Sequence, residues 1–200
     1  AYIPQSLDWP VAAGVPLAGH TAWQALVEHG QIEQGQKVLI HGGTGGVGHF
    51  AVQFAKVKGA EVYATASTDS LPFLRELGAD RAIDYKTERF EDICKEFDLV
   101  IDLIGGDTQA RSWQVLGEGG RLVSTLTMPD ASHPQAAGKT GARFTAAPRG
   151  EELTEIAGLI EAGNVQVYLA KVFELEAAVQ ALDYLANEHV HGKVVLHISD

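Results

Sequence analysis

The chain has 200 residues, of which 46% are hydrophobic and 20% charged, enough for one globular domain with a substantial core. The 26 acidic residues outnumber the 15 basic ones, and a net charge of -11 would repel a phosphate backbone, so we expect no nucleic-acid partner. The single cysteine, Cys94, favours a reducing compartment, and we expect a cytoplasmic protein. No apolar run approaches the roughly 20 residues that span a bilayer, and the first residues show no signal-peptide pattern, so we expect no membrane contact.

Short β-branched apolar runs alternate with longer helical patterns along most of the chain. This alternation is typical of βαβ units and predicts an α/β fold with a doubly wound parallel sheet, the Rossmann fold. The predicted strands, in chain order, are Lys37–His41, Glu61–Ala66, Arg81–Asp84, Phe97–Leu103, Arg121–Leu126, Ala142–Ala147 and Lys193–Ile198.

Helices are predicted between these strands. The first has apolar residues at helical spacing from Val47 to Ala55 and ends at Gly59, and the second begins at a cap formed by Asp69 or Ser70 and ends at Gly78. The segment Thr127–Gly141 has no clear period and is predicted to be a loop at the edge of the sheet. Two amphipathic helices, Glu151–Ala162 and Glu174–Asn187, precede the last strand.

A glycine-rich segment, His41–Gly48, joins the first strand to the first helix and contains G-x-G-x-x-G as Gly43, Gly45 and Gly48. In dinucleotide-binding folds the first glycine permits a tight turn, the second lets a pyrophosphate approach the backbone, and the third packs the helix against the strand. Free N–H groups at the helix N-terminus also favour an anion. The alternative is a turn without a ligand, but the surrounding strand, helix and βα units favour a dinucleotide site that includes Gly43 and Thr44.

The second predicted strand ends without the carboxylate that NAD enzymes place on the ribose 2′-hydroxyl. Ala66 stands about where this acid would be, and Ser67 and Thr68 follow it. Two hydroxyl groups in place of an acid suit a 2′-phosphate and predict NADPH as the cofactor. The alternative is that they only begin a turn or cap the next helix. Arg75, on the following predicted helix, and Lys86, after the third predicted strand, are candidate cations for this phosphate.

Six sequence blocks occur in a recognisable order and spacing: Leu17–Trp23, His41–Gly48, Leu77–Tyr85, Asp102–Gly106, Gly119–Ser124 and Gly192–Leu196. Together they resemble the zinc-independent, zeta-crystallin-like quinone oxidoreductases of the medium-chain dehydrogenase/reductase superfamily. The resemblance covers nearly the whole chain. It implies hydride transfer from NADPH to a quinone or an α,β-unsaturated carbonyl, without zinc, in a homodimer.

The resemblance also implies roles for particular residues. Thr21 would lie near the nicotinamide, Gly45, Gly46 and Val47 would contact the pyrophosphate, and Ser67 and Tyr85 would flank the 2′-phosphate. Ile104, Ser124, Thr125 and Leu126 would lie along the ribose and the nicotinamide. Each assignment has an ordinary alternative: Thr21 can bond its own helix, Tyr85 can cover the sheet, and Ile104 can be a core residue. No catalytic residue is assigned.

Relatives of this type begin with a GroES-like catalytic domain that this sequence does not contain, so we expect the chain to be part of a longer polypeptide. Residues 1–172 are predicted to form the dinucleotide-binding domain, and residues 173–200 a helix and a strand that return to the catalytic domain. The alternative function is a non-catalytic dinucleotide-binding module, either a redox sensor or an enoyl-reductase segment of a larger synthase.

The remaining histidine, cysteine and aspartate residues do not indicate a further functional site. His189 and His191 form the only close histidine pair, and no third ligand stands at a recognised spacing, so no metal site is predicted. Cys94 lies beside Lys95, which would lower the pKa of its thiol slightly, yet no nucleophile pattern surrounds it. His41 is expected to bond backbone groups, and Asp102 to cap the turn after its strand. A short-chain dehydrogenase is excluded, because no tyrosine is followed four residues later by lysine.

Overall fold

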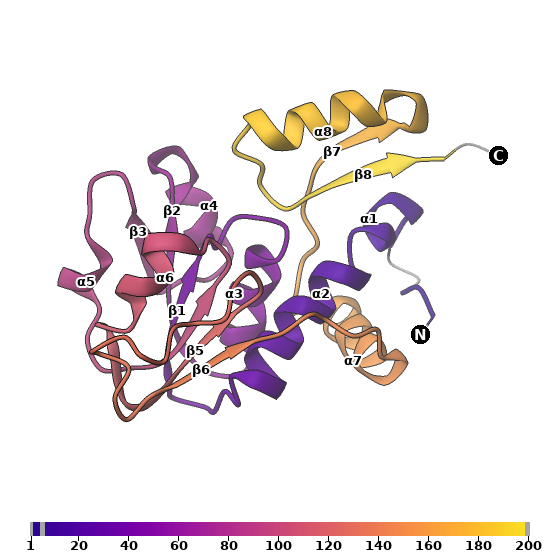
Figure 1. Ribbon diagram of the computed structural model, residues 1–200. Helices are drawn as coiled ribbons and strands as arrows, with labels where there is room; N and C mark the ends of the chain where they lie inside the picture. The colour runs from indigo at the N-terminus through magenta and orange to yellow at the C-terminus, as the bar shows by residue number, and fades with distance from the viewer. Residues whose placement is uncertain (1, 5–6, 199–200) are drawn as a thin grey trace.

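The structure is a computed structural model that describes residues 2–4 and 7–198 (Figure 1). Its larger sheet has six strands in the order β3-β2-β1-β4-β5-β6, and all neighbours are parallel. The strands are β1 (Lys37–His41), β2 (Glu61–Ala66), β3 (Arg81–Asp84), β4 (Phe97–Asp102), β5 (Leu116–Ser124) and β6 (Thr140–Arg143). This order, which reverses direction at β1, is that of the Rossmann fold. The predicted fold class is confirmed.

Helices cover both faces of this sheet and bury two separate cores. The first core lies under α2 (Pro16–Trp23), the π-helix Gln24–His29, α3 (Gly48–Val57), α4 (Leu71–Glu76) and α7 (Gly150–Glu161). The second lies under α5 (Phe90–Ile93) and α6 (Gly106–Ser112). Along β1, Val38 and Ile40 belong to the first core and Leu39 to the second. Burial on both faces explains why the central strands are continuous apolar runs in the sequence.

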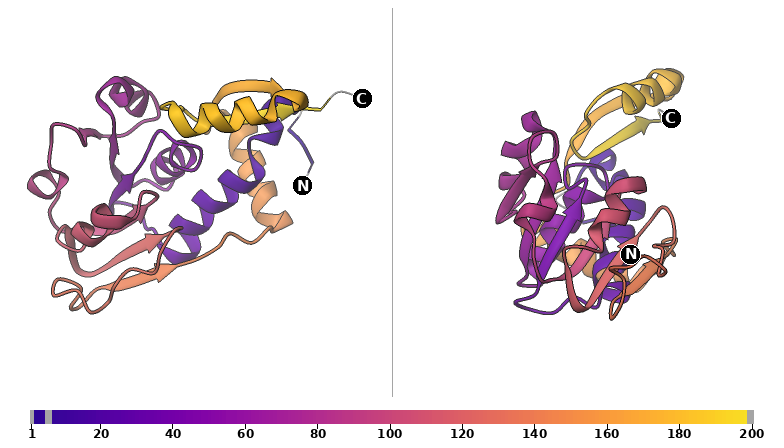
Figure 2. Two further views of the ribbon diagram at one scale, coloured as in Figure 1. Left: turned by 45° about the horizontal axis from the view of Figure 1, so that its top comes forward. Right: turned by 60° about the vertical axis from the view of Figure 1, so that its left-hand side comes forward.

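A second, two-stranded parallel sheet pairs β7 (Leu169–Glu174) with β8 (Lys193–His197). The 3₁₀ turn Leu175–Ala177 and helix α8 (Ala178–Asn187) connect the two strands, and α1 (Trp9–Ala13) contacts β8. Figure 2 shows that α8, β7 and β8 project from the body formed by the larger sheet. None of the helices within residues 2–4 and 7–198 combines the length and apolarity needed to cross a membrane.

Several predicted bounds were wrong. The predicted helix Glu174–Asn187 begins only at Ala178, and Glu174 instead ends strand β7. This strand was missed because two of its six residues are charged and three are exposed, so it lacks the signature of a buried strand. Strand β5 was predicted as Arg121–Leu126 but runs from Leu116 to Ser124. A register shift between Phe97 and Leu99 of the neighbouring strand accommodates the glycines of β5.

Two further corrections concern β6 and the start of α4. The predicted strand Ala142–Ala147 begins two residues earlier and ends four residues earlier, at Thr140–Arg143, and a side chain of the π-helix holds the chain that follows it. The predicted loop Thr127–Gly141 therefore loses its last two residues to this strand. Ser70 is the N-cap residue of α4, as one of the two predicted alternatives had it, but its side chain forms no capping hydrogen bond, and a 3₁₀ turn, Thr68–Ser70, leads into the helix.

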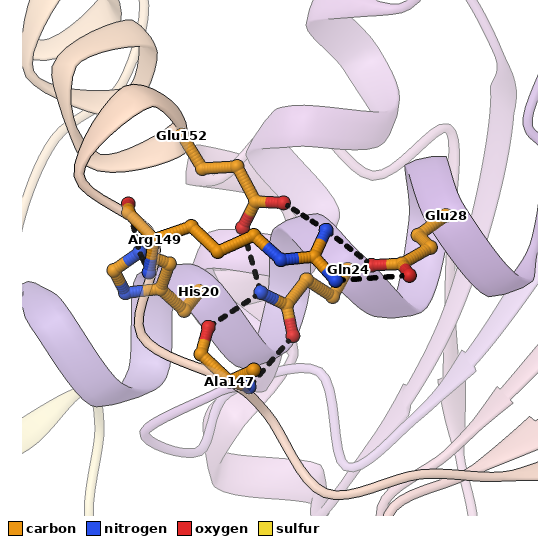
Figure 3. A network of polar contacts seen from close by, with 6 residues as sticks. All are labelled: His20, Gln24, Glu28, Ala147, Arg149 and Glu152. Atoms are coloured by element: carbon orange, nitrogen blue, oxygen red, sulfur yellow. Dashed lines mark hydrogen bonds and ion pairs between the residues drawn. The ribbon is translucent and has the colours of Figure 1, made fainter.

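Two buried glutamines form hydrogen bonds between crossover segments and the helices that cover the first core. Gln24 donates from Nε2 to the carbonyl of Ala147 (2.7 Å) and accepts the N–H of Ala147 (3.0 Å) through Oε1, as Figure 3 shows. Gln53 holds both backbone groups of Gln166 in the same way, at 2.9 and 2.8 Å. Each amide thus replaces one rung of a β-ladder where no strand is present, and it pairs both backbone groups of the residue that it contacts.

Charged groups complete the contact around Ala147. The Nε2 of Gln24 also donates to Glu152 (2.6 Å), and the Arg149 guanidinium lies 2.9 Å from both Glu28 and Glu152 (Figure 3). The hydrogen bond from Arg149 holds the pKa of Glu28 below its usual value. The crossover from β6 to α7 is therefore fixed to α2 and the π-helix.

We predict that Gln24→Met lowers the free energy of unfolding by about 2–4 kcal/mol, because both backbone groups of Ala147 lose their partner. Urea denaturation measures the loss. Gln114→Met is the matched control, since Gln114 is exposed, and it should change the free energy by less than about 0.5 kcal/mol. An equally small effect of Gln24→Met would show that water satisfies the two backbone groups of Ala147 as well as Gln24 does.

Candidate functional site

A cavity of about 960 Å³ opens at the carboxyl ends of β1 and β4. This is the point where the strand order reverses, and Rossmann folds bind their ligands there. Its walls come from the turn between β1 and α3, the ends of β2 and β4, the segment after β3, and residues 188–190 and 192–194 leading into β8. The volume lies at the upper end of the range of about 300–1,000 Å³ common for small-molecule sites.

The turn after β1 is held by tight backbone packing. Gly42 has a φ of +75°, and Thr65 of β2 accepts the Gly42 N–H at its hydroxyl (3.2 Å) and the Gly43 N–H at its carbonyl (3.1 Å). A Cβ at Gly43 would come within 2.7 Å of Leu74, and one at Gly48 within 2.8 Å of the Gly43 Cα. The first and third glycines of the motif are therefore required by packing.

Gly45 differs from these two glycines. A Cβ there would approach only the carbonyl oxygen of Gly42, at 3.6 Å, and the residue lines the cavity. The open space over Gly45 lies at the N-terminus of α3, where the first N–H groups have no partner within the helix. This geometry fits a dinucleotide pyrophosphate, which needs close approach to backbone N–H groups.

The predicted cofactor-binding residues divide into two groups. Eight line the cavity: Thr44, Gly45, Gly46, Val47, Ser67, Tyr85, Ile104 and Thr125. The other five do not: Thr21, Gly43, Thr68, Ser124 and Leu126. Three hydroxyls in the second group bond inside the protein, as Thr21 donates to the Leu17 carbonyl (2.7 Å), Thr68 to Asp84 (2.6 Å) and Ser124 to Asp102 (2.8 Å).

The end of β2 has the polar character expected from the sequence. The Ser67 hydroxyl is paired with that of Ser70 (3.0 Å), which in turn contacts Nε2 of His191 (2.7 Å). Two nearby carboxylates are already engaged: Asp84 accepts from Thr68, and Glu88 accepts the Asp84 N–H (2.9 Å) and pairs with Arg81. The bond from Thr68 lowers the pKa of Asp84.

The cations that line the cavity are not those considered from the sequence. Arg75 and Lys86 do not line it, whereas Arg89, Arg111 and Lys193 do. Arg111 is bound to Glu91 and Asp107, so its charge is compensated. Arg89 stands only five residues after Asp84, the last residue of β3, so its place near the end of this strand is visible in the sequence. For Lys193, no local signal connects the last strand with the glycine turn.

Two buried histidines, His41 and His49, lie next to the glycine turn. His41 bonds the hydroxyls of Thr65 (3.3 Å) and Ser112 (3.0 Å), so the expectation that it bonds backbone groups was wrong. His49 donates from Nδ1 to the Gly45 carbonyl (3.0 Å), and its Nε2 is buried without a partner. Burial lowers the pKa of each to about 4, so both rings are neutral at pH 7.

Asp102 and Cys94 have structural environments. As predicted, Asp102 caps the turn after β4, accepting the N–H groups of Ile104 (3.0 Å) and Gly105 (2.8 Å). Cys94 is fully buried, and burial raises the pKa of its thiol to about 12, outweighing the neighbouring Lys95 charge. The thiol is therefore protonated and not a nucleophile at neutral pH.

Comparison with known proteins agrees with this geometry. The zinc-binding dehydrogenase family matches residues 77–196. The chain belongs to this family. Together with its relatives, this match places the chain in the medium-chain dehydrogenase/reductase superfamily, as its nucleotide-binding part. Within residues 2–4 and 7–198, no three His, Cys, Asp or Glu side chains gather as zinc ligands would, so these residues do not fit a zinc ion.

Three relatives illustrate the range of this family. The chain is 38% identical over 198 residues to the NADPH-dependent alkenal/one oxidoreductase of Arabidopsis thaliana, covering 97% of this chain and 48% of that protein. It is 36% identical over 210 residues to polyketide synthase GfsB of Streptomyces halstedii, covering 99% of this chain and 4% of that protein. The quinone oxidoreductase structure from Coxiella burnetii superposes with a TM-score of 0.91 at 37% identity, covering 98% of this chain and 62% of that one. The chain thus spans only part of these proteins.

We predict that acid destabilises the protein through His41 and His49. The unfolded chain binds protons on these residues near pH 6.5 and the folded chain only near pH 4, so stability falls as the pH falls through that window. Each residue should contribute a loss of about 1–2 kcal/mol between pH 7 and pH 5. Urea denaturation at the two pH values measures it. His49→Gln should remove about half of this dependence, and an unchanged dependence would contradict the assignment.

Proposed function

We propose that this chain is the NADPH-binding part of an oxidoreductase that transfers hydride to quinones or α,β-unsaturated carbonyls. The observation that carries the proposal is the open position at Gly45, at the N-terminus of α3, inside a cavity at the switch point of the sheet. The names of two relatives, an NADPH-dependent alkenal/one oxidoreductase and a quinone oxidoreductase, support both the cofactor and the substrate class.

In this proposal each wall of the cavity has a separate task. Residues 44–47 bind the diphosphate. Ser67 and Tyr85 face the 2′-phosphate, and Arg89 is a nearby cation. Ile104 and Thr125 lie along the ribose next to the nicotinamide. The other five predicted residues do not line the cavity and have no ligand role in this proposal: Thr21, Gly43, Thr68, Ser124 and Leu126.

Bound NADPH supplies the hydride at C4 of its nicotinamide. The residues of this chain bind the cofactor, orient it and exclude water from one side. We place the substrate-contacting groups on a further part of the polypeptide, which residues 173–200 would face. The exposed apolar side chains of α8, Val179, Leu182 and Leu185, support this placement, because such a patch needs a covering surface.

We further propose a cytoplasmic homodimer. The support for a dimer is β6, which ends the larger sheet and leaves one of its sides unpaired among the described strands. The support for the cytoplasm is the single, fully buried cysteine.

The match to a polyketide synthase favours a second candidate, an enoyl-reductase segment of a larger synthase. A steady-state assay of the complete polypeptide with enoyl thioesters and with free quinones and enones separates the two. Faster turnover of the thioesters would support the second candidate.

We predict that Gly45→Val lowers NADPH affinity at least about a hundredfold, since a branched side chain would occupy the space of the diphosphate. Calorimetric titration measures the affinity, and circular dichroism should show an unchanged fold. Gly158→Val is the control, because Gly158 is an exposed helical position with nothing within 4 Å of its Cβ site. Unchanged affinity of Gly45→Val would mean that the segment is only a turn.

We also predict that the chain binds NADPH more tightly than NADH, by about tenfold to a thousandfold, through one or two hydrogen bonds to the 2′-phosphate. Ala66→Asp should shrink or invert this ratio, because the new carboxylate would repel the phosphate. Ala137→Asp, in an exposed loop outside the cavity, adds the same charge and should leave the ratio unchanged. Tighter binding of NADH by the unaltered chain would rule out Ser67 and Tyr85 as phosphate ligands.

A further inference from the structure

Asp102, the last residue of β4, places a carboxyl group in the fully buried interior of the protein. Its Oδ1 accepts the N–H groups of Ile104 (3.0 Å) and Gly105 (2.8 Å), which belong to the loop after β4. Its Oδ2 accepts from the hydroxyl of Ser124 (2.8 Å) and from Nε2 of Gln109 (2.9 Å). Because carboxylate oxygens only accept hydrogen bonds, one group collects four donors from a loop, from α6 and from β5.

Ser124 and Gln109 extend this cluster to the loop after β5. The Ser124 hydroxyl, which donates to Asp102, also accepts the N–H of Leu126 (3.1 Å). Nε2 of Gln109 donates to the carbonyl of Thr127 (3.0 Å) as well as to Asp102. The loop after β4 and the loop after β5 are therefore bonded to the same buried carboxyl group.

The two loops also contact each other. Gly105 has a φ of +76°, and a Cβ on it would lie 3.1 Å from Cδ1 of Leu126. The N–H of Thr125 donates to the carbonyl of Asp102 (3.4 Å). Ile104 of the first loop and Thr125 of the second line the cavity, whereas Asp102 does not. The buried carboxyl group thus fixes the spacing of two cavity-lining residues from outside the cavity.

In the proposed function, these two loops face the nicotinamide half of the dinucleotide. A Rossmann sheet has two halves that each bind one mononucleotide, and the halves meet at the switch point of the sheet. The 2′-phosphate belongs to the adenosine half, which the proposal places at the ends of β2 and β3, beside Ser67 and Tyr85. The nicotinamide half then lies over the loops that follow β4 and β5.

We propose that Asp102 is a positioning residue for the nicotinamide. Through its hydrogen bonds to Ser124 and Gln109 it keeps the two loops at a fixed separation, so that Ile104 and Thr125 hold the ring and its ribose in one orientation. This inference rests on the proposed function and adds to it a group that contacts neither cofactor nor substrate. The orientation matters because a displacement of about 1 Å at a reacting centre can slow a reaction about a hundredfold.

The test compares NADPH with adenosine 2′,5′-bisphosphate, which lacks the nicotinamide half, in calorimetric titrations of the complete chain. Ser124→Ala separates Asp102 from the loop after β5, and Gln109→Met separates it from α6. Each variant loses two hydrogen bonds and should bind NADPH about 3- to 30-fold more weakly than the unaltered chain. The affinity of each for the bisphosphate should stay within about twofold of that of the unaltered chain.

Ser112→Ala is the matched control. Ser112 is also a fully buried serine with two hydrogen bonds, which go to His41 (3.0 Å) and to the carbonyl of Thr108 (2.7 Å) instead of to the two loops. The two serine variants should lose similar stability in urea. Only Ser124→Ala should change the ratio of the NADPH affinity to the bisphosphate affinity.

The fluorescence anisotropy of the reduced nicotinamide provides a readout that a loss of folding stability alone would not change. At saturating NADPH it should be lower in Ser124→Ala and in Gln109→Met than in the unaltered chain, because the ring moves more freely. Equal weakening of both ligands would overturn the inference, and so would unaltered NADPH affinity and anisotropy in both variants. Either result would leave the proposed function intact, whereas an unaltered chain that binds neither ligand would overturn both.

Discussion

The contact between the backbone at Gly48 and that at Gly42 and Gly43 is the constraint on which the site depends. This contact leaves no space for a side chain at Gly48, so α3 begins immediately after the turn and directs its N-terminus at the cavity. The turn is then held from two further directions, by Thr65 of β2 and by the Gly192 N–H before β8. The open space over Gly45 is thereby formed by the packing of the chain itself.

Uncharged polar side chains hold segments of the chain that lie away from the turn. Gln24 and Gln53 each satisfy both backbone groups of a residue more than a hundred positions away in the sequence. Buried and hydrogen-bonded amides avoid the desolvation cost of buried charges, so these links are compatible with the apolar core around them. Through Gln53 and the following residues, α3 fixes the path of the chain into β7, and thus where the second sheet begins over the cavity.

Local patterns allowed the centre of the fold to be predicted from the sequence. Strands β1, β2 and β3 have the predicted bounds, because each has buried apolar residues at its centre and stands between turn residues. Strand β7 was missed because its sheet has only two strands and Lys171 and Glu174 interrupt its apolar pattern. The glycine turn was predictable because its motif is contiguous. The position of Lys193 beside the cavity was not predictable, because it depends on the docking of a distant strand. For Ser124, the sequence shows that the residue has a hydroxyl group but not which group the hydroxyl bonds.

Hydrogen–deuterium exchange of the complete chain, with and without saturating NADPH, tests most directly whether the dinucleotide occupies this cavity. Exchange should slow at the amides of residues 42–48 and 188–194, and it should not change around the second cavity, of about 460 Å³, between α3, α4 and Tyr168. Unchanged exchange in the glycine turn, or protection confined to the cavity beside Tyr168, would contradict the assignment of the site.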